Sequence, residues 1–106
     1  MKRLLPLLLL VALLIVLMAD VGFAEKQCYG VVYDIWYNSV DGADVYLQGP
    51  VNKHTLSDGD GTYAFSGLEI GWYKLWAEKG NQKSAVHDVY FDGETPIEQD
   101  LVLGIE

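Results

Sequence analysis

The chain has 106 residues and carries 7 Lys and Arg against 15 Asp and Glu, a formal charge of −8. Residues 25–106 alone carry five lysines, no arginine and a formal charge of −9, and they are enough for one small domain but not for two. The acidic excess disfavours nucleic acid as a partner, because phosphate binding requires clustered Lys and Arg. The single cysteine, Cys28, excludes an intrachain disulfide framework and a CxxC zinc site, and we expect it to be a buried small side chain.

Residues 1–24 have the pattern of a targeting segment. Lys2 and Arg3 precede an apolar run over residues 4–19, and a small-x-small ending suited to a signal peptidase follows. The run is shorter than the ~20 residues that a membrane-spanning helix usually needs. The sequence therefore predicts a cleaved signal peptide, with an uncleaved membrane anchor as the alternative. Both place the rest of the chain (25–106) outside the cytoplasm, as a secreted or extracytoplasmic domain.

Short strands are predicted for the remainder. Gly, Asn and Asp recur at intervals of about eight to twelve residues, and apolar side chains alternate with polar ones between them, which indicates strands rather than helices. The predicted strands cover residues 27–35, 44–48, 53–57, 62–66, 72–78, 83–91 and 97–103. Seven short strands fit an all-β, two-sheet Greek-key sandwich, in which each sheet covers one face of the other.

The same alternation predicts the core, since one side chain in two points inward along a strand. The side chains predicted to point inward are Val45, Leu47, Tyr63, Phe65, Tyr73, Leu75, Ala77, Val89, Phe91, Ile97, Leu101 and Leu103. In the first strand, Cys28 and Val32 share one face, and Tyr29 and Tyr33 share the other.

An ordered set of short motifs combines turn glycines with alternating apolar residues. The motifs are Gly30-x-Val32-x-Asp34, Gly42-Ala43-x-Val45-x-Leu47-x-Gly49, Thr55-x-Ser57-Asp58, Asp60-Gly61-x-Tyr63-x-Phe65, Leu68-x-x-Gly71-x-Tyr73-x-Leu75-x-Ala77-x-x-Gly80 and Asp100-Leu101-x-Leu103. In this order and spacing they resemble the carboxypeptidase regulatory-like domain, a transthyretin-like β-sandwich related to Cna B-type repeats. The resemblance implies an accessory module that usually lacks catalytic groups of its own.

Few side chains suggest a catalytic or metal-binding role. His54 and His87 are far apart in sequence, and neither lies beside a motif serine, a cysteine or a metal-spaced carboxylate, so we expect neither catalysis nor a bound cofactor. Asp58 and Asp60 have the alternate spacing of a partial calcium loop, but a third acidic position and a bidentate Glu are missing. A β-turn explains the same residues. A calcium-stabilised, adhesin-like domain is the weaker alternative.

Aromatic residues are the most informative feature of the sequence. Three Trp and seven Tyr exceed what so small a core holds. The aromatic side chains that alternation predicts to face outward are Tyr29, Tyr33, Tyr46, Trp72 and Trp76. Lys74 lies between the two tryptophans. Exposed aromatic rows bind sugar rings or protein partners, although cross-strand pairs that only stabilise a sheet give the same pattern.

Two functions follow from these observations. The first is a non-catalytic extracytoplasmic module that acts in protein interaction or as a structural part of the cell envelope. The second is a carbohydrate-binding module that uses Trp72, Lys74, Trp76 and Tyr46. An enzyme is disfavoured because the sequence shows no catalytic set, and membrane contact is expected only through residues 4–19 if they are not removed.

Overall fold

The computed structural model of the chain describes residues 25–104, and the predicted signal segment (1–24) lies outside the described residues. The described part is built of β-strands, and none of it forms a helix long and apolar enough to cross a membrane. The strands are β1 (Cys28–Tyr33), β2 (Asp44–Gln48), β3 (Lys53–Leu56), β4 (Thr62–Phe65), β5 (Gly71–Lys79), β6 (Gln82–Lys83), β7 (His87–Phe91), β8 (Ile97–Glu98) and β9 (Leu101–Val102). The all-β prediction is confirmed.

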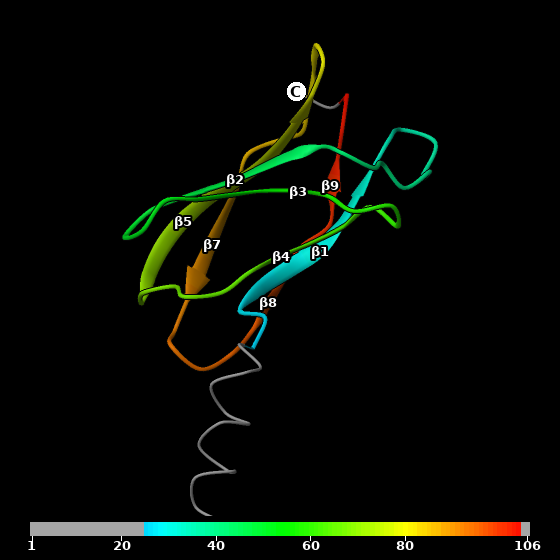
Figure 1. Cartoon of the computed structure of the whole chain (residues 1–106). Coiled ribbons are helices and arrows are strands. Elements are labelled where there is room, and N and C mark those ends of the chain that lie inside the picture. Colours follow the sequence, from blue (N-terminus) through cyan, green and yellow to red (C-terminus); the bar gives the residue numbers. More distant parts are fainter. Residues whose placement is uncertain (1–24, 105–106) are drawn as a thin grey trace, which may run out of the picture.

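The strands form two sheets that lie in two layers (Figure 1). In the four-stranded sheet β1 is central: it pairs antiparallel with β4 along one edge and parallel with β8 and β9 along the other. The five-stranded sheet has the order β3-β2-β5-β6, and β7 also pairs with β5. All of its strand pairs are antiparallel.

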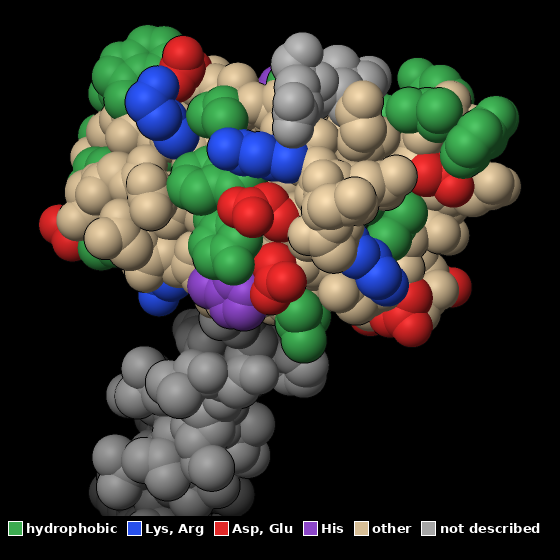
Figure 2. Space-filling model, turned by 90° about the horizontal axis from the view of Figure 1, so that it is seen from above, with side chains coloured by type: hydrophobic (Ala, Val, Ile, Leu, Met, Phe, Trp, Pro, Cys, Tyr) green, Lys and Arg blue, Asp and Glu red, His purple; other side chains and the backbone are tan. Residues whose placement is uncertain are grey.

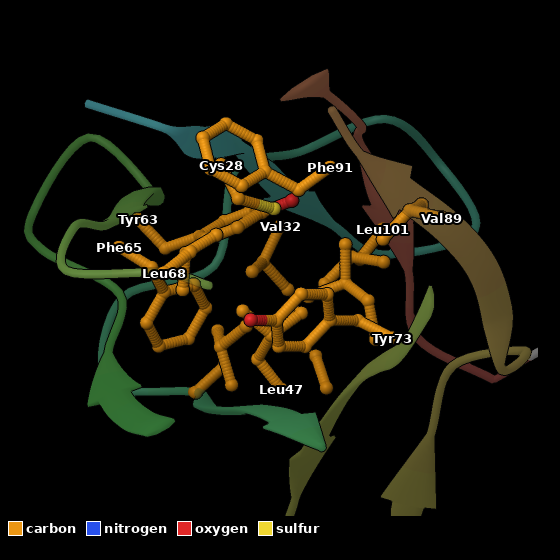
Figure 3. Close-up of a cluster of buried hydrophobic side chains, with 14 of the residues drawn as sticks. Cys28, Val32, Leu47, Tyr63, Phe65, Leu68, Tyr73, Val89, Phe91 and Leu101 are labelled. Atoms are coloured by element: carbon orange, nitrogen blue, oxygen red, sulfur yellow. The ribbon is translucent and has the colours of Figure 1, made fainter. Parts of the chain in front are cut away.

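One apolar core lies between the two sheets (Figure 3). Its buried hydrophobic side chains are Cys28, Val32, Ala43, Val45, Leu47, Tyr63, Phe65, Leu68, Tyr73, Leu75, Ala77, Val89, Phe91, Leu101 and Leu103. The predicted inward residues are all among them except Ile97, which is partly buried and packs against the cluster. Every member lies within residues 28–103, so a chain that begins at residue 25 contains the whole cluster and is expected to fold on its own.

The predicted strand 83–91 is divided into β6 and β7 by a β-bulge. Lys83 lies opposite Glu78, whereas His87 lies opposite Leu75, so the register shifts by one residue between the two pairs. One extra residue in a strand locally disrupts the ladder and increases its twist. Alternation alone did not reveal this interruption.

The predicted strand 97–103 is divided for a different reason. β8 and β9 keep the same register against β1, but at the step between them the Oδ1 atom of Asp100 accepts a hydrogen bond from the amide of Val31 at 3.0 Å. A side chain therefore takes the place of a backbone acceptor in the ladder. With the bulge, this gives nine strands where seven were predicted.

The first strand ends earlier than predicted. It was expected to run to Ile35 but ends at Tyr33, because Asp34 folds the following residues into a tight loop. Its Oδ1 atom accepts hydrogen bonds from the amides of Trp36 and Asn38, both at 2.9 Å. Asp is favoured at such positions because its side chain bonds to nearby backbone amides.

Candidate functional site

The outer surface of the five-stranded sheet carries aromatic and charged side chains next to one another. We call it the aromatic face. It is formed by Asp44, Tyr46, Gln48, His54, Trp72, Lys74, Trp76, Glu78, Lys83, Asp88 and Tyr90. Figure 2 looks down on this side of the molecule and shows hydrophobic, acidic, basic and histidine side chains next to one another. The predicted ligand-binding residues Tyr46, Trp72, Lys74 and Trp76 all lie on it.

The row of side chains that contains Trp76 is engaged in contacts within the sheet. Tyr46 lies directly across from Trp76, and their rings stack with centroids 5.3 Å apart and an interplanar angle of 22°. The indole N–H of Trp76 donates a hydrogen bond to Glu78 at 2.7 Å, and the Lys83 ammonium lies 5.6 Å from the ring centroid. Trp76 is half-buried as a result, and its contacts are those of a side chain that stabilises the sheet.

The row that contains Trp72 is more open. Trp72 lies directly across from Tyr90, with ring centroids 5.2 Å apart and planes tilted by 58°. The side chains remain 66% and 48% exposed, respectively. Trp72 therefore presents an indole ring to solvent on the same strand and the same face as the packed Trp76.

A groove of about 710 Å³ opens beside Trp72. Its lining residues are Gln48, Gly49, Asn52, Trp72, Tyr73, Lys74 and Asp88. The volume is in the ordinary range of small-molecule sites, roughly 300–1,000 Å³. Amide, ammonium and carboxylate groups beside an exposed ring supply both the donors and the acceptors that a polyhydroxylated ligand needs.

The charged side chains of the aromatic face are paired across strands. The Lys74 ammonium lies 2.9 Å from Asp88, and Nε2 of His54 lies 2.8 Å from Asp44. Partial desolvation and the nearby carboxylates of Asp44 and Glu78 raise the pKa of Tyr46, so its hydroxyl stays protonated at neutral pH. The second histidine lies in β7, which β2 and β5 separate from the strand of His54.

The outward tyrosines form two separate groups. The sequence alone could not show whether they lie on the same sheet. Tyr46 belongs to the aromatic face, whereas Tyr29 and Tyr33 lie on β1 in the other sheet. A ligand on the aromatic face would therefore not reach those two tyrosines.

Asp58 caps its own turn. Its Oδ1 atom accepts hydrogen bonds from the amides of Asp60 and Thr62 at 3.0 and 2.9 Å, and its Oδ2 atom accepts one from the Thr62 hydroxyl at 2.6 Å. The hydrogen bond from the Thr62 side chain is the main reason that the pKa of Asp58 is lowered. Across residues 25–104, no three His, Cys, Asp or Glu side chains are grouped so that they could hold a metal ion. The geometry is that of the β-turn interpretation, and calcium stays the weaker alternative.

A second exposed apolar group was missed by the sequence analysis. Ile35, Trp36 and Tyr37 lie in the loop after β1 and are 55%, 74% and 75% exposed. The signal was present in the sequence, because Asp34 and Asn38 flank three consecutive large apolar residues and both residue types favour turns. The alternation of the preceding strand was wrongly continued as far as Ile35.

Comparison with known proteins does not add to this description. No protein-family model matches the chain, and no curated protein is similar to it at a significant level. The resemblance to carboxypeptidase regulatory-like domains therefore stays a prediction. The function is inferred below from the geometry of the face itself.

Proposed function

We propose that the chain is a non-catalytic, extracytoplasmic binding module whose ligand docks on the aromatic face at Trp72. The observation that supports this proposal is the contrast between two tryptophans on one strand. Trp76 is half-buried by its neighbours, whereas Trp72 is 66% exposed beside a groove. Exposed aromatic side chains next to a hollow with a few polar groups are typical of ligand sites.

A saccharide is the ligand class that fits this groove best. The indole of Trp72 offers a flat apolar surface for the C–H face of a pyranose ring. Gln48, Asn52, Lys74 and Asp88 surround it with hydrogen-bonding groups for the hydroxyls. The site is the size of one or a few sugar rings rather than of a protein interface.

A protein partner is the second candidate. A stable protein interface covers about 800 Å² on each partner, so it would extend from Trp72 across the row of Tyr46 and Trp76. The aromatic rings of the face favour this candidate as well, because interface centres are enriched in Tyr and Trp.

The proposal that the module carries out no reaction is supported by the state of its ionisable groups. His54 with Asp44, and Lys74 with Asp88, form pairs whose side chains are all more than 40% exposed. Catalytic acids and bases are usually held in desolvated positions that tune their ionisation. The extracytoplasmic location rests on the signal pattern of residues 1–24. The Greek-key, transthyretin-like connectivity rests on the motif resemblance.

Glycan-array screening of residues 25–106 tests this function, followed by calorimetric titration of the strongest hit. Trp72→Ala should weaken binding at least about tenfold, because losing a buried aromatic contact costs roughly 1.5–3 kcal/mol. Trp36→Ala removes an equally exposed indole from another part of the domain and should leave this affinity unchanged. Binding of an envelope protein that is weakened by Tyr46→Ala, with no glycan signal, would select the second candidate. Ligand binding that tolerates Trp72→Ala would overturn both.

A further inference from the structure

The loop between β1 and β2 carries an exposed apolar group that the aromatic face does not use. Its tip is formed by Ile35, Trp36 and Tyr37, each more than half exposed. Figure 1 shows this loop projecting at the far end of β1 from residue 25, and Figure 2 shows hydrophobic side chains gathered at the same edge of the molecule. We call residues 34–38 the Trp36 loop.

Four of the five backbone amides of the Trp36 loop donate hydrogen bonds to acceptors within the loop. The Asp34 carboxylate accepts hydrogen bonds from the amides of Trp36 and Asn38, both at 2.9 Å. The Asp34 carbonyl accepts a hydrogen bond from the amide of Tyr37 at 3.0 Å, and the Asn38 carbonyl accepts one from the amide of Asp34 at 2.9 Å. These four amides therefore need no water, although the side chains of the tip are in contact with solvent.

The tip also holds a strained residue. Tyr37 has a φ of 64°, in the left-handed region that bulky side chains rarely adopt. Gly or Asn would take this conformation at a lower cost. The Tyr37 ring contacts the ring of Tyr33, with centroids 5.4 Å apart and planes tilted by 56°, yet Tyr37 is still 75% exposed. A tyrosine that keeps an unfavourable backbone conformation and a largely exposed ring points to a role for the exposed side of that ring.

The charge around the loop restricts what it could contact. From Gln27 to Asn52 the sequence has no Lys or Arg, and Asp34 and Asp41 lie in or near the loop. One cation reaches this segment from β5, since the Lys79 ammonium donates a hydrogen bond to the Asp41 carbonyl. The whole described part has five lysines and 13 Asp and Glu. An anionic lipid surface would be repelled by this field, whereas a zwitterionic one would not.

We propose that the Trp36 loop inserts Ile35, Trp36 and Tyr37 into the interfacial region of a zwitterionic lipid bilayer. Trp and Tyr are enriched at this depth because their rings have an apolar body and a polar end. An unpaired backbone amide is costly in lipid, and four of the five amides of this loop, including those of Trp36 and Tyr37, are paired before insertion. Three side chains give a weak, reversible attachment. The proposal depends neither on the ligand of the aromatic face nor on residues 1–24.

Phosphatidylcholine vesicles and residues 25–106 test this inference. With Trp72→Phe and Trp76→Phe in place, fluorescence reports Trp36 alone, and it should shift to shorter wavelength and be quenched by lipids with brominated acyl chains. In the natural background, Trp36→Ala should lower the vesicle partition coefficient about tenfold, the effect of withdrawing one large apolar side chain from lipid. Trp72→Ala is the matched control, since it removes a similarly exposed indole elsewhere, and it should leave the partition coefficient unchanged.

A second variant tests the role of the paired amides. Asp34→Ala keeps all three apolar side chains but releases the amides of Trp36 and Asn38, so partition should fall although the apolar surface is retained. Circular dichroism confirms that each variant is folded. The inference is overturned if the natural domain does not co-sediment with phosphatidylcholine vesicles. The loop would then be a candidate contact for a protein partner instead. It is also overturned if binding requires anionic lipid, or if Trp36→Ala and Trp72→Ala reduce it equally.

Discussion

Tyr46 stacks on Trp76 across β2 and β5, with ring centroids 5.3 Å apart and planes 22° from parallel. Trp72 lies on the same face of the same strand, and its contact with Tyr90 leaves it 66% exposed. Two residues of one type, four positions apart, therefore have different expected roles. Trp76 belongs to the sheet, and Trp72 is available to a ligand.

The stability of tryptophan variants tests this distinction. A double-mutant cycle on Tyr46 and Trp76 should give a coupling free energy of about 0.5–1.5 kcal/mol, the usual value for a stacked aromatic pair. Trp72→Ala should lower the free energy of unfolding by less than about 1 kcal/mol, because it breaks only one exposed cross-strand pair. Urea denaturation measures both. Zero coupling between Tyr46 and Trp76 would contradict the structural role of that pair.

Gly30 is expected to tolerate no side chain. It lies opposite Tyr63, and a Cβ atom at this position would be 2.0 Å from the carbonyl oxygen of Gln99. Gly30→Ala should therefore destabilise the domain by about 3 kcal/mol, through overpacking between β1 and the β8–β9 step. Gly59→Ala is the matched control, because a Cβ there meets nothing within 4 Å. Equal melting temperatures for the two variants would show that this packing is wrong.

The Tyr63 hydroxyl donates a hydrogen bond to the same Gln99 carbonyl, and burial raises the pKa of this tyrosine. Tyr63→Phe keeps the ring but leaves the carbonyl without this donor, at an expected cost of about 1–3 kcal/mol in the free energy of unfolding. Chemical denaturation at neutral pH measures the difference. A variant as stable as the natural domain would mean that water replaces the hydroxyl at no cost.

Two turn-capping carboxylates should make stability depend on pH. Asp92 accepts hydrogen bonds from the amides of Thr95 and Glu94 and from the Thr95 hydroxyl. The backbone hydrogen bond from Thr95 is the largest cause of its lowered pKa, whereas the largest cause of the lowered pKa of Asp58 is the hydrogen bond from the Thr62 side chain. A carboxyl group whose folded pKa is lowered stabilises the protein above its unfolded pKa of about 4, and this contribution is lost as the pH falls through the folded pKa.

The difference in unfolding free energy between the natural domain and Asp92→Ala should therefore be largest near neutral pH and shrink below about pH 4. The difference between the natural domain and Asp58→Ala should depend on pH in the same way. Urea titrations at pH 7 and pH 3 give both differences. A difference of the same size at the two pH values would exclude the carboxylates as its source.

The thiol of Cys28 should be unreactive in the folded domain. Cys28 is fully buried, and burial raises the pKa of its thiol to about 11. At pH 8 a chromogenic disulfide reagent should react with it only after urea is added, because the thiolate is both rare and inaccessible. Non-reducing electrophoresis of the natural protein should show no cysteine-linked dimer. Rapid labelling without denaturant would place Cys28 outside the core.

Much of the core could be predicted from the sequence, because in a strand with one buried face every second side chain is apolar and points inward. Tyr73, Leu75 and Ala77 are buried as expected, between Trp72, Lys74 and Trp76 that are not. Alternation carries no information on which strands are neighbours. The separation of Tyr46 from Tyr29 therefore had to come from the structure.

The interruptions of the strands were not predictable by the same means. The bulge before His87 and the Asp100 side chain at the β8–β9 step depend on contacts between residues far apart in the chain. The loop at Trp36 is a different case. Its turn is encoded locally by Asp34. Three consecutive large apolar residues, however, are expected to be buried, and here they lie at an exposed tip.

Nuclear magnetic resonance of the indole groups tests the central claim most directly. ¹⁵N-labelled residues 25–106 give one indole N–H signal each for Trp36, Trp72 and Trp76, and substitution to Phe assigns them. On titration with the oligosaccharide that scores highest on the array, the Trp72 signal and the amide signals of Lys74 and Asp88 should shift together, while the Trp36 signal stays in place. Saturable binding that leaves the Trp72 signal unmoved would contradict the account.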